Sequence, residues 1–417
     1  MRCRRTLEPM APGDRRTVPF VLAAKATRTF CYGYLGVLLP VYLDHLGVGP
    51  RGIGVAVALT LAASAGLTVA LRRPVERLGG RAVLVALAGL IVVAGALLAT
   101  ARSPAWVVLA AMLGNVAVST GETGPFLSIE QVLVARAAPR GRLTQWMSAY
   151  YLVGYAAAGL GALAVAASTG RGAPAGVAPY GLLFWVFAAS GALQAALYAQ
   201  LPPTPPRQPE RAGGRLPSSG LIYRIAVLFA LDSFAGGFVL QSLMVYWLHV
   251  RFDLSAAALG SVFFGTQVLT VCSLLIAASA ARHLGLVNTM VFSHLASNVL
   301  LILMGLAPTA ALAVGLLLAR ALLSQMDVPT RQTFLMLVVG DAEREAAATV
   351  TNAGRTVSQA VSPALTGYVM QALALSAPFL LGGGLKIVYD LLLYGLCRRA
   401  GLTGAGLTAR ERGGSAA

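Results

Sequence analysis

The sequence predicts an all-α integral membrane protein with twelve transmembrane helices in two pseudo-symmetric six-helix halves and both termini in the cytoplasm. Three observations lead to this prediction: an apolar composition, twelve apolar runs of spanning length, and arginines gathered on one side of those runs. Of 417 residues, 57% are apolar and 11% are charged, and the mean hydropathy is +0.74. Soluble domains carry about 25% charged residues. The composition therefore excludes a water-soluble enzyme or a nucleic-acid-binding protein.

The apolar runs are long enough for transmembrane helices. Crossing about 30 Å of hydrocarbon takes about 20 mostly apolar residues at 1.5 Å per residue. The first run contains Lys25 and Arg28, and no small-residue cleavage site follows it, so it is expected to stay as a helix and not to be removed as a signal peptide. The runs cover residues 19–43, 53–71, 82–101, 105–134, 145–168, 180–201, 221–248, 255–280, 286–306, 309–339, 346–372 and 376–397.

The arginines test this topology independently of the apolar runs. With both termini inside, 21 arginines lie in predicted cytoplasmic segments and four on the opposite side, namely Arg51, Arg102, Arg171 and Arg251. Short cytoplasmic loops of membrane proteins carry an excess of basic residues, whereas arginines that merely followed loops would divide more evenly. The net charge of +17 is thus explained by membrane orientation and needs no polyanionic partner.

A proline- and glycine-rich stretch divides the chain. Residues 202–220 lack helical periodicity and are predicted to form a cytoplasmic linker between halves 19–201 and 221–397. Residues 1–18 and 398–417 are expected to be cytoplasmic tails, the first of them basic.

The two halves also resemble each other at an offset of 204 to 206 residues. Several matches at nearly one offset indicate a parallel repeat of six spans, a plan known among secondary transporters. The matches include Thr29-Phe30 with Ser233-Phe234, Tyr42 with Tyr246, His45 with His249, Leu78-Gly79 with Leu284-Gly285, and Asn115, Ser119 and Glu122 with Arg320, Ser324 and Asp327.

One local motif, between the second and third runs, adds a family resemblance. Glu76, Arg77, Gly79 and Arg81 follow the acidic-Arg-x-Gly-basic-basic loop of the major facilitator superfamily, and the whole chain resembles such a transporter. The resemblance implies that this loop locks the halves together on the cytoplasmic side and that spans one, four, seven and ten line a central cavity. Glu76 replaces the usual Asp, and Gly80 replaces a basic residue. The alternative of a short basic turn that serves only membrane orientation stays open.

Ionisable side chains within the predicted spans are the candidate site. Each costs at least about 2.5–3.5 kcal/mol at the centre of a membrane helix, so it is a functional hypothesis by default. Four polar residues from Arg320 to Arg331 share one helix face at spacings of i, i+4, i+7 and i+11. The candidate cavity residues are Lys25, Arg28, Tyr32, Asn115, Asp232, Gln241, Arg320, Ser324, Arg331 and Arg355.

Four residues carry weaker expectations. Pro125 and Pro329 are predicted to kink the fourth and tenth spans just beyond their carboxylates. Glu130 lies near a span end, where a solvated or loop-pairing role is at least as well supported as a cavity role. Asn115 stands where drug–proton antiporters of the family have arginine, and this departure weakens a claim of drug–proton antiport.

These features favour a secondary active transporter that moves a small solute across the cytoplasmic membrane by alternating access. Glu122 and Asp327 are the candidate proton-coupling residues, because a carboxylate whose partner comes and goes can load and release protons. Two alternatives stay open: an uncoupled facilitator or substrate antiporter in which these carboxylates are permanent ion pairs, and a non-transporting membrane scaffold or sensor. No nucleotide-binding, protease or esterase motif occurs, and the four cysteines lack metal-site spacing. No enzyme activity, cofactor, metal, nucleotide or nucleic acid is expected, and the chain is expected to act as a monomer.

Charge gives two last expectations. Counting the five basic candidates against Glu122, Asp232 and Asp327 leaves a surplus of two positive charges, which favours an anionic or zwitterionic solute. Arg28 and Asp232 are repeat-equivalent and therefore lie at the same depth with opposite charges. The sequence predicts that they pair across the pathway when the cytoplasmic side closes. The alternative is pairing within each half, for example Arg28 with Glu122 and Asp232 with Arg320.

Overall fold

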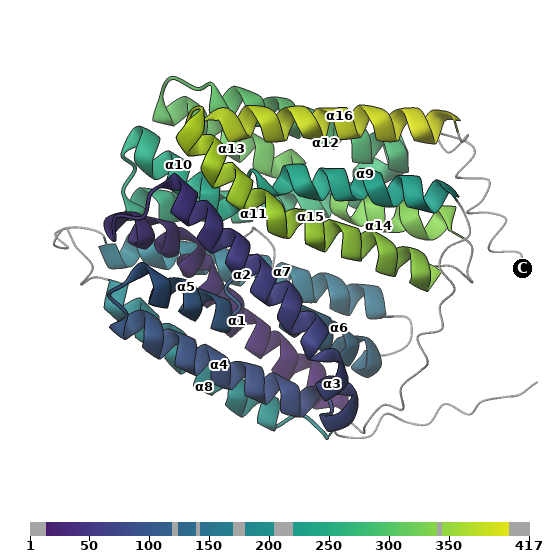
Figure 1. The fold of residues 1–417 in the computed structure, drawn as a ribbon. Helices are drawn as coiled ribbons and strands as arrows, with labels where there is room; N and C mark the ends of the chain where they lie inside the picture. The colour runs from purple at the N-terminus through teal and green to yellow at the C-terminus, as the bar shows by residue number, and fades with distance from the viewer. Residues whose placement is uncertain are drawn as a thin grey trace, which may run out of the picture.

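The chain, described here from a computed structural model, is helical through almost all of the residues the structure describes, which are 14–118, 124–138, 142–169, 180–203, 220–339 and 344–399 (Figure 1). Each predicted apolar run coincides with one helix or with two consecutive helices. Within these ranges, eight helical segments are long and apolar enough to cross a membrane, as expected of a multi-pass membrane protein.

The helices before residues 204–219 are called the first half and those after them the second half. The first half contains α1 (Asp14–His45), α2 (Pro50–Ala70), α3 (Arg72–Leu78), α4 (Gly80–Thr100), α5 (Pro104–Leu113), α6 (Pro125–Ala137), α7 (Leu143–Thr169) and α8 (Gly181–Ala199). The second half contains α9 (Gly220–Gly237), α10 (Gln241–Phe252), α11 (Ala256–Leu284), α12 (Leu286–Gly305), α13 (Ala310–Leu323), α14 (Asp327–Val338), α15 (Arg344–Ala372) and α16 (Ala377–Arg399).

Three of the predicted spans are interrupted: the fourth between α5 and α6, the seventh between α9 and α10, and the tenth between α13 and α14. The kinks expected at Pro125 and Pro329 are instead helix ends, located before each proline. Proline lacks an N–H and is well tolerated in the first turn of a helix, where that donor has no partner. Pro125 is the first residue of α6, and Pro329 is the third of α14. Gly124, before Pro125, has φ 109°, a value that favours glycine.

One turn is repeated in both halves. Gly79 precedes α4 with φ 83° and ψ 156°, and Gly285 precedes α12 with φ 84° and ψ 153°. Both lie in a region that side chains rarely adopt, which explains why glycine stands at both positions. The sequence match at this offset therefore corresponds to the same backbone geometry.

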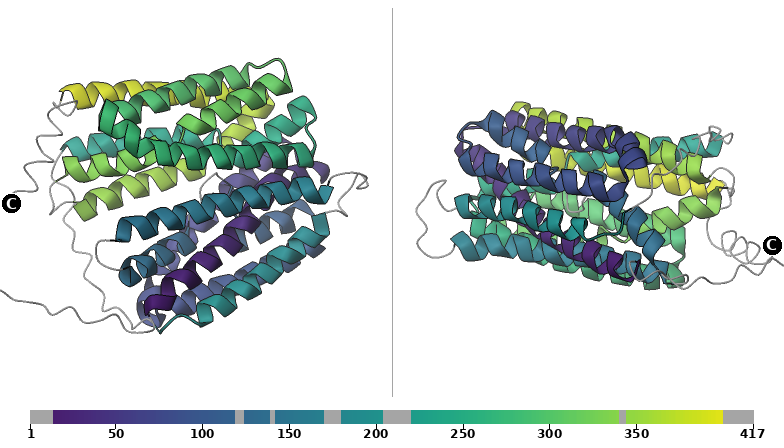
Figure 2. Two further views of the ribbon diagram at one scale, coloured as in Figure 1. Left: turned by 180° about the vertical axis from the view of Figure 1, so that it is seen from behind. Right: turned by 90° about the horizontal axis from the view of Figure 1, so that it is seen from below.

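The halves approach each other closely at the end of the bundle where His45 and His249 lie, here called the distal end; the opposite end, where residues 203 and 220 lie, is the linker end (Figures 1 and 2). The rings of His45 and His249 are 6.0 Å apart, and the His249 imidazole lies 3.8 Å from the Asp44 carboxylate. On α2, a Cβ added to Gly54 would lie 2.7 Å from Cα of Gly367 on α15. Small residues thus let backbones of the two halves touch.

Gly54→Val is expected to separate the halves at the distal end, because its Cβ would lie 2.4 Å from the backbone oxygen of Pro363. In a variant without native cysteines, disulfide formation between cysteines placed at His45 and His249 measures the contact. Gly54→Val should lower its yield severalfold. Gly66→Val on the same helix is the matched control, since nothing lies within 4 Å of its Cβ. Equal yields in the two valine variants would contradict this packing.

Candidate functional site

The first half buries a complete ion pair. Arg28 on α1 donates from Nη2 to Oε2 of Glu130 on α6 at 2.6 Å, and from Nη1 to Oε1 at 3.0 Å. Both residues are 0% exposed. Two parallel bonds between a guanidinium and a carboxylate fix the orientation of both groups. A pair this deeply buried requires its remaining donors and acceptors to be satisfied as well.

Neighbouring helices supply those partners. The Tyr198 hydroxyl on α8 accepts from Arg28 Nη1 at 2.6 Å and donates to Glu130 Oε1. Tyr150 on α7 donates to Glu130 Oε2 at 2.6 Å, and Gln194 accepts from Arg28 at 3.3 Å. The Arg28 guanidinium also lies 4.3 Å from the centre of the Phe126 ring. The network joins four helices of the first half around one charge pair.

This arrangement corrects the solvated or loop-pairing role considered for Glu130. It belongs to the fourth span and lies near its end in sequence, but α6 turns its side chain inward, where Arg28, Tyr150 and Tyr198 surround it. The environment of Glu130 therefore depends on the face of α6 that carries it, and not on its distance from the end of the span. Glu122, the partner considered for Arg28, lies outside the described residues.

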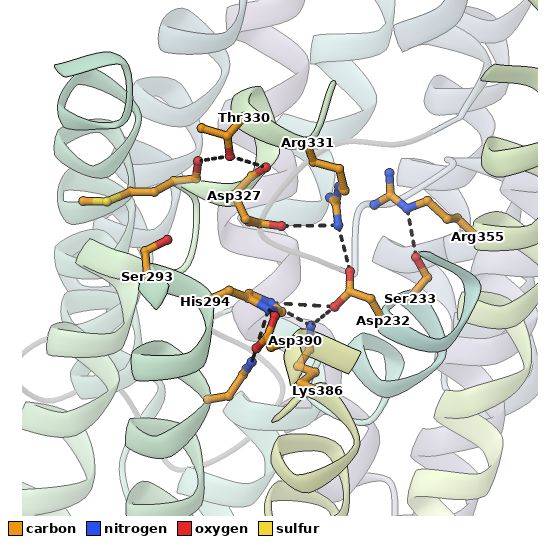
Figure 3. Close-up of polar contacts among 12 residues, drawn as sticks. Asp232, Ser233, Ser293, His294, Asp327, Thr330, Arg331, Arg355, Lys386 and Asp390 are labelled. Carbon is orange, nitrogen blue, oxygen red and sulfur yellow. Dashed lines mark hydrogen bonds and ion pairs between the residues drawn. The ribbon is translucent and has the colours of Figure 1, made fainter. Parts of the chain in front are cut away.

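The second half contains a larger network centred on Asp232 (Figure 3). Asp232, on α9, accepts at Oδ2 from Arg331 Nη1 at 2.8 Å and at Oδ1 from Lys386 Nζ at 2.7 Å. Arg331, on α14, also lies 3.2 Å from Oδ2 of Asp327, which begins the same helix. One buried carboxylate is thus shared by two cations from two other helices.

A histidine–aspartate pair adjoins this carboxylate (Figure 3). His294 on α12 lies with Nδ1 2.8 Å from Oδ1 of Asp390 on α16, and Asn298 donates to the other oxygen of Asp390 at 3.0 Å. The second ring nitrogen, Nε2, lies 3.4 Å from Lys386 Nζ and 3.7 Å from Asp232 Oδ1. All five side chains are buried.

Arg28 and Asp232 do not pair with each other in this structure. Each has partners of opposite charge in its own half, so the predicted pair across the pathway is absent in this arrangement. Pairing within each half, the alternative, is what the structure shows, but with Glu130 for Arg28 and with Arg331 for Asp232 in place of Arg320. The polarity is reversed between halves: span one carries the cation and span seven the anion.

Three other predicted residues of the first half are buried, and two of them, Tyr32 and Asn115, lie at the interruption of the fourth span. Tyr32 donates from its hydroxyl to the Gly114 carbonyl at 3.0 Å. Asn115, with φ 49°, follows that carbonyl, and its side chain lies against Gly124. Lys25 lies three residues before Arg28 with Nζ 4.4 Å from the centre of the Tyr150 ring, close to the Arg28 network.

In the second half, the remaining predicted residues lie at helix ends or beside Asp232. Gln241 begins α10 and is buried near Gly36 of α1, at the contact between halves. Arg320 lies in the last turn of α13, and Ser324 follows the end of that helix; within the described residues, Nε of Arg320 is buried without a hydrogen-bond partner. Arg355 on α15 donates from Nε to Oγ of Ser233 at 2.9 Å, next to Asp232 (Figure 3).

The loop motif contributes no charge to either network. Glu76 lies 3.7 Å from Arg72 at i,i+4 on the short helix α3, and Arg77 is exposed. Gly79 supplies the turn into α4, and Arg81, half-buried, belongs to the first turn of that helix. The motif lies on the first half, at the linker end of the bundle.

Besides Tyr150 and Tyr198, the sequence reasoning missed five residues that complete the networks, because it concentrated on spans one, four, seven and ten. A usable signal was present: polar residues at i,i+4 within apolar helices place two side chains on one face. The rule that marks intramembrane charges applied equally to α12 and α16. The missed residues are Gln194 on α8, His294 and Asn298 on α12, and Lys386 and Asp390 on α16.

Comparisons with known proteins agree with this architecture. No protein-family model matches the chain. It is 24% identical over 420 residues to "Uncharacterized membrane protein YJR124C" of Saccharomyces cerevisiae, covering 91% of this chain and 93% of that protein.

Solved structures of transporters superpose on most of the chain. A mutant of nucleoside transporter NupG has a TM-score of 0.74 at 13% identity and covers 91% of this chain and 99% of its own. A POT family transporter in complex with 5-aminolevulinic acid has 0.74 at 13%, covering 94% and 97%. A D-xylose-proton symporter has 0.71 at 13%, covering 90% and 97%. These likenesses identify the fold of this chain as that of the major facilitator superfamily transporters.

Proposed function

We propose that this protein is a secondary active transporter of the cytoplasmic membrane that moves a small solute by alternating access. The observation that supports this most strongly is the pair of buried charge networks, one in each half. Each network includes at least one side chain from an interrupted span. A scaffold has little use for so many costly buried charges, and broken helices near the membrane midplane are typical of transporter binding sites. The experiment that tests it is solute uptake or efflux by the purified protein reconstituted into liposomes.

The packing between halves supports a state that is closed at the distal end. Gly54, Gly367, His45 and His249 form contacts between the halves there. With the arginine-rich linker end in the cytoplasm, as the positive-inside rule favours, this state is inward-facing. Transport then requires a second state in which the distal contacts open and the linker ends of the halves approach. Twelve spans with both termini cytoplasmic are part of this proposal.

The proposed coupling ion is the proton, with Asp327 and Glu122 as coupling residues. Asp327 touches Arg331, which is shared with Asp232, so a proton on Asp327 would leave Arg331 to Asp232 alone. Protonation of Asp327 can thus strengthen the pair between Arg331 and Asp232 without moving a helix. The alternative is an uncoupled facilitator or antiporter in which Arg331 keeps both carboxylates ionised throughout.

Asp327→Asn and Glu122→Gln keep side-chain shape but remove titration. If these residues carry protons, each variant should lose most gradient-driven accumulation, at least about tenfold, while exchange of labelled for unlabelled solute continues. Asp253→Asn makes the same chemical change as Asp327→Asn at an exposed residue outside the site and the loop motif, so it is the matched control and should accumulate solute normally. Accumulation with unchanged pH dependence in both variants would favour the uncoupled transporter.

The proposed solute is anionic or zwitterionic. Glu130 and Asp390 cancel the surplus of two positive charges counted from the sequence, and Lys386 adds one back, so a surplus of one positive charge remains. Arg320 contributes one charge to this surplus, and within the described residues its Nε, near the end of α13, has no hydrogen-bond partner. A screen that compares binding of anionic metabolites and of cationic dyes to the purified protein tests the charge argument. We expect anions to bind to the parent protein and at least about tenfold more weakly to Arg320→Gln, and preferential binding of cations would contradict it.

A further inference from the structure

We propose that His294 is a proton-binding site, and that a proton on its Nε2 exchanges with the Lys386 ammonium for Asp232. This inference rests on the proposed proton-coupled function and assigns to it a residue on α12 that lies outside spans one, four, seven and ten. It follows from the positions of two side chains, His294 and Lys386, around one carboxylate oxygen of Asp232 (Figure 3).

The hydrogen bonds define the neutral form of the imidazole. An ionised carboxylate only accepts, so Nδ1, at 2.8 Å from Asp390 Oδ1, carries a proton and donates it; the Asn298 amide nitrogen lies 3.2 Å from Nδ1 but is itself a donor, and it gives its hydrogen to Asp390 instead. Asn298 donates to the other oxygen of Asp390 and holds that carboxylate in place. Lys386 only donates, so Nε2, at 3.4 Å from its Nζ, presents its lone pair to the ammonium. In this form His294 can take up one proton, at Nε2.

Adding that proton changes the contacts of Asp232. The new N–H and the Lys386 ammonium would be two positive groups 3.4 Å apart, and like charges at this distance repel strongly in a buried site. Asp232 Oδ1 is an acceptor 3.7 Å from Nε2, within reach after a small ring movement. Protonated His294 therefore takes Oδ1, and Lys386 leaves it. Gly236 leaves room beside Nζ, which lies 3.7 Å from the position of an added Cβ.

The charged groups around His294 come from four helices. Asp390, Lys386 and Tyr389 lie on α16, and Tyr389 places its ring 5.9 Å from the imidazole. Asp232 lies on α9. The second oxygen of Asp232 holds Arg331 on α14, which contacts Asp327, and Arg355 on α15 is bonded to the adjacent Ser233.

The consequence for transport is a physical link between two proton sites. Asp232 joins them, because Oδ1 faces His294 and Lys386 while Oδ2 faces Arg331 and through it Asp327. A proton on His294 displaces Lys386 from Oδ1 toward the space beside Gly236. The net charge of the network rises by one, and the group that binds Oδ1 changes from a flexible lysine on α16 to an imidazole on α12. Relative positions of α9, α12 and α16 thereby respond to proton binding.

Nitrogen-15 NMR of histidine-labelled full-length protein in lipid nanodiscs tests this directly. The chain has four histidines, so the signal absent from His294→Gln is that of His294. At alkaline pH we expect a protonated Nδ1 and a bare Nε2, and a second proton at Nε2 as the pH falls. Lys386→Met removes the competing ammonium, so the ratio of protonated to neutral His294 at a given pH should rise about tenfold or more. Lys386→Arg keeps the charge and should leave the ratio close to that of the parent.

Failure of this inference is distinguishable from failure of the proposed function. A bare Nδ1, a His294 that binds no second proton while the protein stays folded, or a ratio unchanged in Lys386→Met would overturn it even if solute transport is coupled to protons. If the protein moves no solute, a Lys386-dependent titration still establishes the proton site. In a transporting protein, His294→Gln should abolish proton-driven accumulation while solute exchange continues, and retained accumulation would overturn the assignment.

Discussion

Replacing Arg28 with alanine is expected to lower the free energy of unfolding by about 3–5 kcal/mol, because Glu130 then remains as a buried carboxylate without a cation. Arg28 and Glu130 are 0% exposed and joined by two hydrogen bonds. Thermal or denaturant unfolding in detergent measures the effect. The matched control is Arg72→Ala, which removes an exposed i,i+4 partner of Glu76 and should cost less than about 1 kcal/mol.

The partner of Arg28 can be identified by exchanging charges. Arg28→Glu combined with Glu130→Arg should recover part of the stability lost by either change alone, because the pair is restored with reversed polarity. Arg28→Asp combined with Asp232→Arg should not, since those residues have separate partners in separate halves. Recovery by the second combination and not the first would show that the pair across the pathway dominates.

Asp232→Asn is expected to have the second large effect, again several kcal/mol, because it leaves Arg331 and Lys386 buried with one neutral acceptor between them. Adding Lys386→Met to Asp232→Asn should return part of that stability by removing one of the two cations. Asp253→Asn makes the same chemical change at an exposed residue with φ 53°, a conformation that asparagine tolerates, and should be nearly neutral. Additive losses in the double variant would contradict the shared-carboxylate geometry.

The helical plan was predictable because hydrophobic length and repeated turns are local signals. Each predicted run coincides with helices in the structure, and the Leu78-Gly79 match at Leu284-Gly285 marks the same left-handed turn. The interruptions were predictable only in part. Pro125 and Pro329 indicated a disturbance, but whether a helix bends or ends depends on the contacts of the freed backbone groups, such as Tyr32 to Gly114.

The charged residues of the site were predictable as a set, but their partners were not. Arg28, Asp232, Asp327 and Arg331 stood out because each is costly in a membrane span. Which carboxylate Arg28 contacts depends on which face α6 turns toward α1. The span is interrupted before α6, so the sequence alone does not predict that face. His294 belongs to a helix outside the four spans that the family resemblance emphasised, so it was passed over although the same cost argument applied.

Alternating access is the central claim, and spin-label distances at both ends of the bundle test it most directly, without knowledge of the solute. In a cysteine-free background, one label pair joins Arg51 and Leu373 at the distal end, and a second joins Arg73 and Arg398 at the linker end; all four residues are exposed. The account predicts two populations related inversely, in which the distal distance lengthens as the linker-end distance shortens. Lowering the pH and Gly54→Val should each change their ratio. The claim of alternating access would be contradicted if each label pair gave one unchanged distance under all these conditions. It would also be contradicted if the distal and linker-end distances lengthened and shortened together.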